Sequence, residues 1–194
     1  MALAPPSALS PRVPAEAPDA RLRRMVDQHV DALWRFMRRL GVAEPDLDDA
    51  MQDVIMVTAQ RLSDIQAGSE RSFMYGTAFR VASEWRRRRA GRREVNDAAL
   101  DDHEDLDADL DEVSDRARAR ALLDKVLATM PDDLRAVFTL YEIEEMTMAE
   151  IAELLTLPAG TVASRLRRGR EHFQGQILRL QTKLVARRPT TGAS

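Results

Sequence analysis

The chain has 194 residues, 44% of them hydrophobic and 31% charged, which is enough for one ordinary domain or two small ones. It contains no cysteine, which excludes disulfide bonds and thiolate metal sites, and its three histidines lack metal-ligand spacing. The net charge of −3 hides a strong pattern, because residues 94–115 hold 11 acidic side chains and no Lys or Arg, between two segments in which basic residues are in excess.

The N-terminal part is predicted to change from a disordered segment to helices. Residues 1–20 include five prolines, which cannot hold a helix or a sheet ladder, so we expect disorder there. The following apolar residues recur at three- and four-residue steps, which predicts a helix that stops at Gly41. A second helix is expected next, with a buried apolar stripe running from Leu47 to Val57.

A third helix is expected from Phe73 to Arg89, after a loop over residues 63–72. Its last turns are almost pure arginine, and the run continues to Arg93. Cations suit the negative end of a helix, but four in succession exceed what the dipole requires. Residues 21–93 are therefore predicted to form one small helical domain with a basic face.

The acidic segment 94–115 is predicted to be a flexible linker, because like charges at this density repel one another and extend a chain. Helical patterns resume in residues 116–180, with Pro131 ending one helix and a further helix expected from Leu134 to Ile143. Residues 181–194 are expected to form a flexible tail. No strand is predicted, so the fold class is all-α, with two small helical domains.

The most informative stretch is TMAEIAELLTLPAGTVASRLRRGR, residues 147–170, which predicts a helix-turn-helix. Pro158 cannot continue the first helix but suits the first turn of the second. One side of the second helix is predicted to pack against Ile151 and Leu155; it carries Val162, Leu166, Gly169 and Phe173. The other side would face DNA, and its candidate contacts are Thr161, Ser164, Arg165, Arg167 and Arg168. Taken alone, the pattern also fits an amphipathic hairpin with a solvated basic face.

These residues resemble the C-terminal domain of bacterial sigma factors of the sigma-70 family, in the extracytoplasmic-function (ECF) group. The matching letters are EIA at 150–152, LP at 157–158, and the run from Gly160 to Arg170. DLDDAMQDV, residues 46–54, is similar to the family segment that docks on the polymerase clamp helices. FMYGTAFRVASEWRRRR, residues 73–89, looks like the segment that melts and reads the −10 element. Thr156 stands where the family usually has glycine, so we expect a wider turn.

The resemblance implies a role for each segment. The second domain would bind the −35 element and the polymerase flap, and the first would bind core polymerase and the −10 region. The −10 region and its phosphates would meet Arg80, Arg86, Arg87, Arg88 and Arg89. The polymerase would meet Asp48, Asp49, Gln52, Asp53 and Met56, an acidic edge beside an apolar anchor. From its residues alone, that edge fits a capped amphipathic helix equally well.

The resemblance thus predicts a cytoplasmic sigma factor whose partners are core RNA polymerase, promoter DNA and an anti-sigma factor. We expect no cofactor, no metal, no small-molecule substrate and no membrane insertion, since no apolar run approaches bilayer length. No glycine-rich phosphate loop or nucleophile motif is present, so we expect no enzyme activity. An autonomous helix-turn-helix regulator that acts without polymerase is the alternative, although such proteins usually dimerise and no dimerisation coil is evident.

Overall fold

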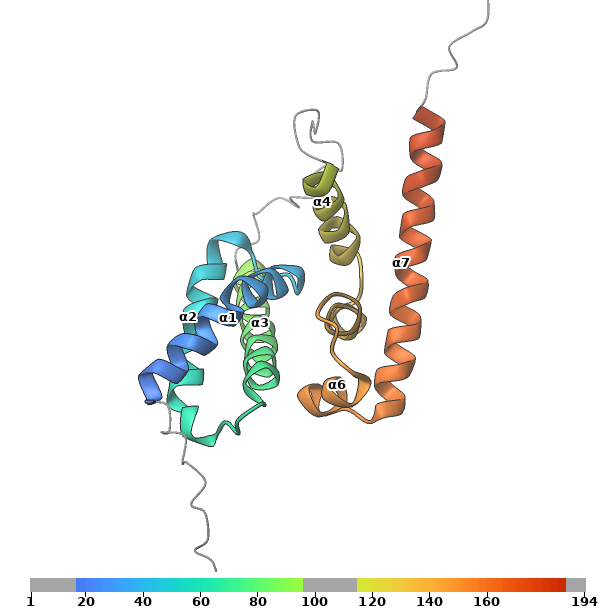
Figure 1. Cartoon of the computed structure of the whole chain (residues 1–194). Helices are drawn as coiled ribbons and strands as arrows, with labels where there is room; N and C mark the ends of the chain where they lie inside the picture. Colours follow the sequence, from blue (N-terminus) through green and yellow to red (C-terminus); the bar gives the residue numbers. More distant parts are fainter. Residues whose placement is uncertain (1–16, 96–114, 188–194) are drawn as a thin grey trace, which may run out of the picture.

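The computed structural model describes residues 17–95 and 115–187, and all its regular elements are helical. The first of these ranges, here called the N-terminal half, contains α1 (Pro18–Arg39), α2 (Leu47–Gln60) and α3 (Glu70–Val95). Short 3-10 turns over Glu44–Asp46 and Leu62–Asp64 connect them. The three helices pack against one another as a bundle (Figure 1).

The C-terminal half, residues 115–187, contains α4 (Asp115–Ala128), α5 (Asp132–Phe138), α6 (Met148–Leu155) and α7 (Ala159–Arg187). The helix expected to run to Ile143 instead widens into a π-helix, η3, over Thr139–Ile143. The long α7 lies along α4 and α5 and meets α6 at its start (Figure 1). It also continues to Arg187, seven residues into the segment 181–194 that the sequence predicts as a tail.

Most of the remaining boundaries follow from local signals that the sequence carries. Pro18 occupies the first turn of α1, where its missing N–H costs nothing. Gly41 ends α1 with φ of +91°, a conformation that glycine adopts without strain, which confirms the predicted stop. The all-α class is confirmed for the described residues. Residues 1–16, 96–114 and 188–194, which hold nearly all of the predicted N-terminal segment and acidic linker, lie outside them.

One buried cluster runs through both halves. It contains Phe36 and Tyr75 from the N-terminal half together with Val137, Ile151 and Leu166 from the C-terminal half. A smaller cluster, in which Met130 and Phe138 are buried, joins α4, α5 and α7. The two halves therefore pack on each other through a shared apolar core. Within the described ranges, no helix is both long and apolar enough to cross a membrane.

Candidate nucleic-acid interface

The helix-turn-helix predicted from the sequence is formed by α6, a three-residue turn and the start of α7. Thr147 caps α6: its hydroxyl accepts a hydrogen bond from the Glu150 N–H at 3.3 Å, and the Glu150 carboxylate accepts one from the Thr147 N–H at 2.7 Å. This capping box supplies hydrogen-bond acceptors for two N–H groups that have no carbonyl partner within the helix. The hydrogen bonds from Thr147 lower the pKa of Glu150 below its ordinary value, so the carboxylate keeps its charge.

The turn itself is tight, which corrects our expectation of a wider one. Thr156 adopts the left-handed conformation, with φ of 54° and ψ of 49°, at the C-terminus of α6. The Leu157 N–H then donates to the Ala152 carbonyl at 2.9 Å, the bond that usually accompanies glycine at this place. The chain therefore keeps the geometry and accepts strain at a β-branched residue.

The buried side of α7 agrees with the predicted residues but only partly with the predicted neighbours. Val162 and Leu166 are buried in the core that contains Ile151. Gly169, however, lies against Phe138 of α5, and the Phe173 ring stacks on the Phe138 ring with centroids 5.1 Å apart. The expectation that all four α7 residues pack on α6 was wrong for the last two, because a straight helix carries them beyond the short α6.

The opposite side of α7 carries the residues predicted to meet DNA, here called the recognition edge: Thr161, Ser164, Arg165, Arg167 and Arg168. Arg167 and Arg168 are exposed, and Arg167 forms an ion pair with Glu171 at 2.5 Å. Thr161 and Ser164 are half-buried near the start of the helix. Arg165 differs from its neighbours, since only 26% of its side chain is exposed and its guanidinium pairs with Asp133 at 3.3 Å.

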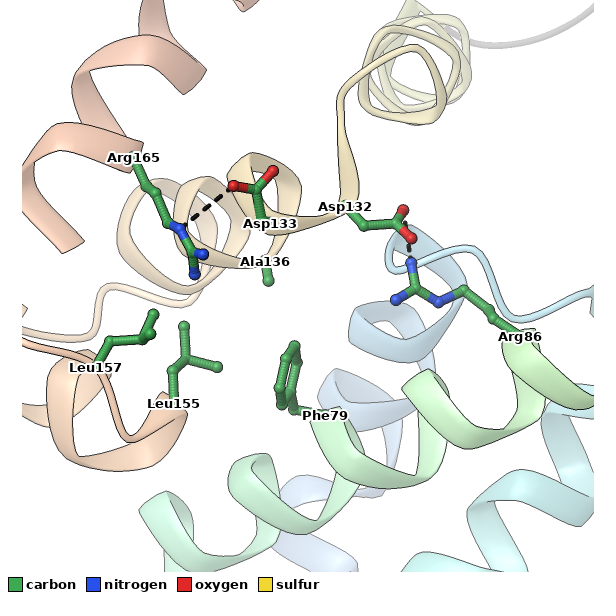
Figure 2. A pocket seen from close by; sticks show the side chains of 8 residues that line it. All are labelled: Phe79, Arg86, Asp132, Asp133, Ala136, Leu155, Leu157 and Arg165. Carbon is green, nitrogen blue, oxygen red and sulfur yellow. Dashed lines mark ion pairs between the residues drawn. The ribbon is translucent and has the colours of Figure 1, made fainter. Parts of the chain in front are cut away.

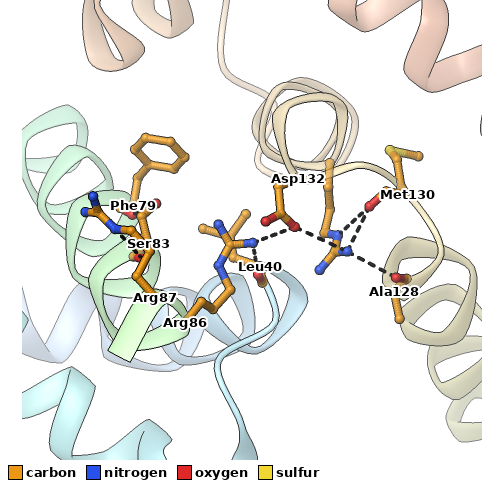
Figure 3. A network of polar contacts seen from close by, with 9 residues as sticks. Leu40, Phe79, Ser83, Arg86, Arg87, Ala128, Met130 and Asp132 are labelled. Atoms are coloured by element: carbon orange, nitrogen blue, oxygen red, sulfur yellow. Dashed lines mark hydrogen bonds and ion pairs between the residues drawn. The ribbon is translucent and has the colours of Figure 1, made fainter. Parts of the chain in front are cut away.

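The predicted −10 arginines lie on α3, with Arg80 in its middle and Arg86 to Arg89 in its C-terminal part, and they differ in whether they already have a carboxylate partner. Arg80 and Arg87 are exposed. Arg88 pairs with Glu84 at 2.5 Å, and Arg89 pairs with Asp46 at 3.1 Å. These pairs are partly solvated and therefore weak, so a phosphate could replace the carboxylates. Arg86 is different and is held between the halves. It donates to the Leu40 carbonyl at 2.8 Å and pairs with Asp132 at 2.7 Å (Figure 3).

The residues predicted to meet the polymerase lie along one edge of α2, here called the docking edge: Asp48, Asp49, Gln52, Asp53 and Met56. Asp48, Asp49 and Gln52 are exposed, and Met56 exposes 49% of its surface. Two tryptophans hold the carboxylates at the ends, with the Trp34 indole N–H 3.3 Å from Asp48 and that of Trp85 2.9 Å from Asp53.

Val57 extends this edge and corrects another expectation. It was predicted to be buried, yet it exposes 37% of its surface beside Met56. The α2 stripe instead continues through Thr58, whose hydroxyl donates to the Val54 carbonyl at 2.7 Å. An acidic row therefore ends in a two-residue apolar patch, a combination that suits a basic helical partner.

The helix-turn-helix lies in the part of the chain that matches a known family model. Residues 120–173 match the model described as "Sigma-70, region 4". The chain is 26% identical over 156 residues to the ECF RNA polymerase sigma factor SigE of Mycolicibacterium smegmatis, an alignment that spans 79% of this chain. It is 25% identical over 146 residues to the ECF RNA polymerase sigma-E factor of Haemophilus influenzae, spanning 70% of this chain and 77% of that protein.

Residues 120–173 thus match a sigma-70 family model, and the relatives that the chain is similar to are ECF sigma factors, in agreement with the sequence resemblance. The chain spans 60% of the length of the M. smegmatis relative. Its fold is similar to that of the Bartonella quintana sigma factor RpoE solved with the anti-sigma factor NepR, with a TM-score of 0.61 and 19% identity over 81% of this chain and 96% of that one.

Sequence reasoning missed three acidic residues at and near the boundary between the two halves. Glu144 is buried, and its carboxylate accepts a hydrogen bond from the Tyr75 hydroxyl at 2.5 Å. Burial first, and then this hydrogen bond, raise the pKa of Tyr75 well above its ordinary value. Asp132 pairs with Arg86 of the N-terminal half, and Asp133 pairs with Arg165 within the C-terminal half (Figure 2). In the sequence all three look like ordinary surface acids, because no local pattern reveals a partner about 30 to 70 residues away.

Proposed function

We propose that this chain is a sigma factor that binds core RNA polymerase, directs it to specific promoters and assists the melting of promoter DNA. The observation that carries the proposal is the presence of two different surfaces on one sigma-family chain. The recognition edge presents arginines from a helix-turn-helix, and the docking edge presents acids beside exposed Met56 and Val57. A DNA-binding protein that acts alone has no need of the second surface.

The recognition edge is proposed to enter the major groove of the −35 element. Short side chains at Thr161 and Ser164 can approach base edges or phosphates near the start of the helix. Arg167 and Arg168 are long, exposed cations that can bind guanine or clamp phosphates. Arg165 would join them once it leaves Asp133.

The end of α3 is proposed to bind the −10 region. Its arginines, from Arg80 and Arg86 to Arg89, would contact phosphates along the strand that separates during melting. Unstacked bases need an apolar or aromatic platform, and stacking on one ring contributes about 1–3 kcal/mol per base. Phe79 and Trp85 are half-buried rings on this helix, and the Arg88 guanidinium lies 5.9 Å from the Trp85 ring centroid, whereas Tyr75 is buried in the core.

The docking edge is proposed to bind the clamp helices of the largest polymerase subunit, and the C-terminal half to meet the flap. Charge pairs would orient the edge, and Met56 with Val57 would supply the apolar anchor. We propose no catalytic role for the chain, and a cytoplasmic location, where polymerase and promoters are found. An anti-sigma factor is a further proposed partner, supported by the similar fold of the B. quintana protein in its complex with one.

The experiment is a measurement of affinity for core polymerase with two double variants. In Asp49→Asn/Gln52→Ala, both changed side chains are exposed, so the fold should be unaffected. The matched control is Asp27→Asn/Gln28→Ala, which makes the same changes at exposed positions of α1. We expect the first variant to bind core polymerase about tenfold more weakly and the control to bind normally. Equal affinities for the two variants would contradict the docking assignment.

The autonomous regulator is separated from this proposal by a mobility-shift assay on promoter DNA. A sigma factor is expected to give a promoter-specific complex only when core polymerase is present. A specific, saturable shift by the chain alone, unchanged by polymerase, would favour the regulator instead.

A further inference from the structure

The two tryptophans of the chain both lie beside the docking edge. Trp34 belongs to α1 and Trp85 to α3, the two helices that pack against α2. The Trp34 indole N–H donates to an oxygen of Asp48 at 3.3 Å, and the Trp85 indole N–H donates to an oxygen of Asp53 at 2.9 Å. Both rings are half-buried. Two helices other than α2 therefore supply the hydrogen bonds that orient carboxylates on the docking edge.

An arginine lies over each indole ring. The Arg38 guanidinium carbon is 5.5 Å from the Trp34 ring centroid, and that of Arg88 is 5.9 Å from the Trp85 ring centroid. At these distances the ring face attracts the cation, and the contact restricts the tilt of the indole. Each arginine also forms an ion pair with an acid outside the docking edge, which keeps the cation in place. The indole N–H is thus held in one direction before any partner binds.

A neutral hydrogen-bond donor orients a carboxylate without cancelling its charge. Indole is uncharged and can only donate, so Asp48 and Asp53 keep their negative charge while they are bound to it. Asp46, which directly precedes α2, shows the contrast, because it pairs with Arg89 at 3.1 Å and the arginine offsets its charge. A carboxylate that is already oriented but still charged loses little conformational freedom when it meets a cation.

We propose that Trp34 and Trp85 are positioning residues for polymerase binding, which hold Asp48 and Asp53 in the orientation that two cations of the polymerase require. This inference rests on the proposed function, because it concerns the same docking edge. The two aspartates are separated by about 7.5 Å along the α2 axis, so they meet separate cations. Loss of either indole N–H should therefore weaken polymerase binding, chiefly through faster dissociation.

The test uses Trp34→Phe and Trp85→Phe in the full chain, since phenylalanine keeps an aromatic ring but has no N–H. Surface plasmon resonance measures the kinetics of binding to core polymerase. We expect each variant to dissociate about threefold faster and the double variant about tenfold faster, with association rates unchanged because both carboxylates keep their charge. Tyr141→Phe is the matched control: it removes the polar group of a half-buried ring that lies under Arg170, and it should bind normally.

A double-mutant cycle separates positioning from a structural role. In an Asp53→Ala background, Trp85→Phe should change the affinity for core polymerase by less than about 1.5-fold, because the carboxylate that the indole orients is gone. Trp34→Phe should behave in the same way in an Asp48→Ala background. Equal effects of the indole change in both backgrounds would overturn the proposal, since the ring would then act through the fold or through direct contact.

The charge of the positioned carboxylate is tested by Asp53→Asn, which also keeps the proposal testable if a tryptophan variant does not fold. Asparagine still accepts a hydrogen bond from the Trp85 indole but carries no charge. Core polymerase should therefore associate about threefold more slowly at low salt, and the difference should shrink as salt is added. An unchanged association rate would contradict the proposal.

The outcomes distinguish this inference from the proposed function. Failure of the natural chain to bind core polymerase would refute the proposed function. Normal binding by the natural chain, with unchanged dissociation of both tryptophan variants, would refute only the positioning role. Because Trp85 also lies beside Arg88, promoter melting by Trp85→Phe is measured at saturating polymerase and should be normal. A melting defect with unchanged polymerase affinity would assign Trp85 to DNA instead.

Discussion

Replacing Thr156 with glycine should stabilise the protein, although glycine usually weakens a helix terminus whose backbone is not in the left-handed conformation. Thr156 has φ of 54° and ψ of 49°, and its side chain is exposed. A left-handed conformation costs an L-residue about 1–2 kcal/mol, because Cβ approaches a carbonyl oxygen. Glycine avoids that cost but loses about 0.5–1 kcal/mol more conformational freedom on folding. The difference predicts a net stabilisation of about 0.5–1 kcal/mol.

Thermal and urea denaturation, followed by far-ultraviolet circular dichroism, measure this effect. The expected rise in the thermal midpoint is about 1–4 °C for a chain of this size. Glu145, which also has φ of 54°, provides a replicate, and Glu145→Gly should change stability in the same direction. Ala149→Gly is the matched negative control, since Ala149 is exposed within α6 and the change should cost about 1 kcal/mol. A Thr156→Gly variant no more stable than the natural chain would refute the strained turn.

Three further variants test the boundary, the pH response and the DNA edge. Tyr75→Phe should lower the free energy of unfolding by about 1.5–3 kcal/mol in the natural chain, but by clearly less in a Glu144→Gln background. Urea denaturation measures both values. If the costs of the two substitutions simply add, the two groups are not coupled. Burial, and then Arg71, lower the pKa of His29 below its ordinary 6.5, so the unfolded state binds the proton more tightly and stability should fall as pH drops below about 6.5. His29→Gln should reduce this dependence of stability on pH. An unchanged pH dependence would exclude His29 as its source. Arg168→Ala should weaken −35 binding and lower the salt slope by about 1 if it contacts phosphate, and a loss confined to particular sequences would indicate a base contact instead.

The helices of this chain could be predicted because their signals are local. Apolar spacing marks the buried stripes, Gly41 and Pro131 mark ends, and the Thr147 capping box marks the start of α6. The same signals identified the recognition edge and most of the docking edge as helix faces. Which cations on those faces remain free was not predictable, because that depends on how the two halves pack.

The errors share this long-range origin. Val57 was assigned to the core by periodicity, but the N-terminal half offers no surface to cover it. The π-helix after Phe138 shifts later residues to another face, which takes Glu144 into the boundary. Thr156 was expected to widen its turn on intrinsic preference, whereas packing of α6 on α7 imposes the tight geometry.

The most direct measurement is transcription in vitro from a library of random promoters, with core polymerase in the presence and absence of the chain. The account predicts new start sites that depend on the chain and share two separated sequence elements, at about −35 and −10. The Asp49→Asn/Gln52→Ala variant should lose them. Identical transcripts with and without the chain would contradict the account.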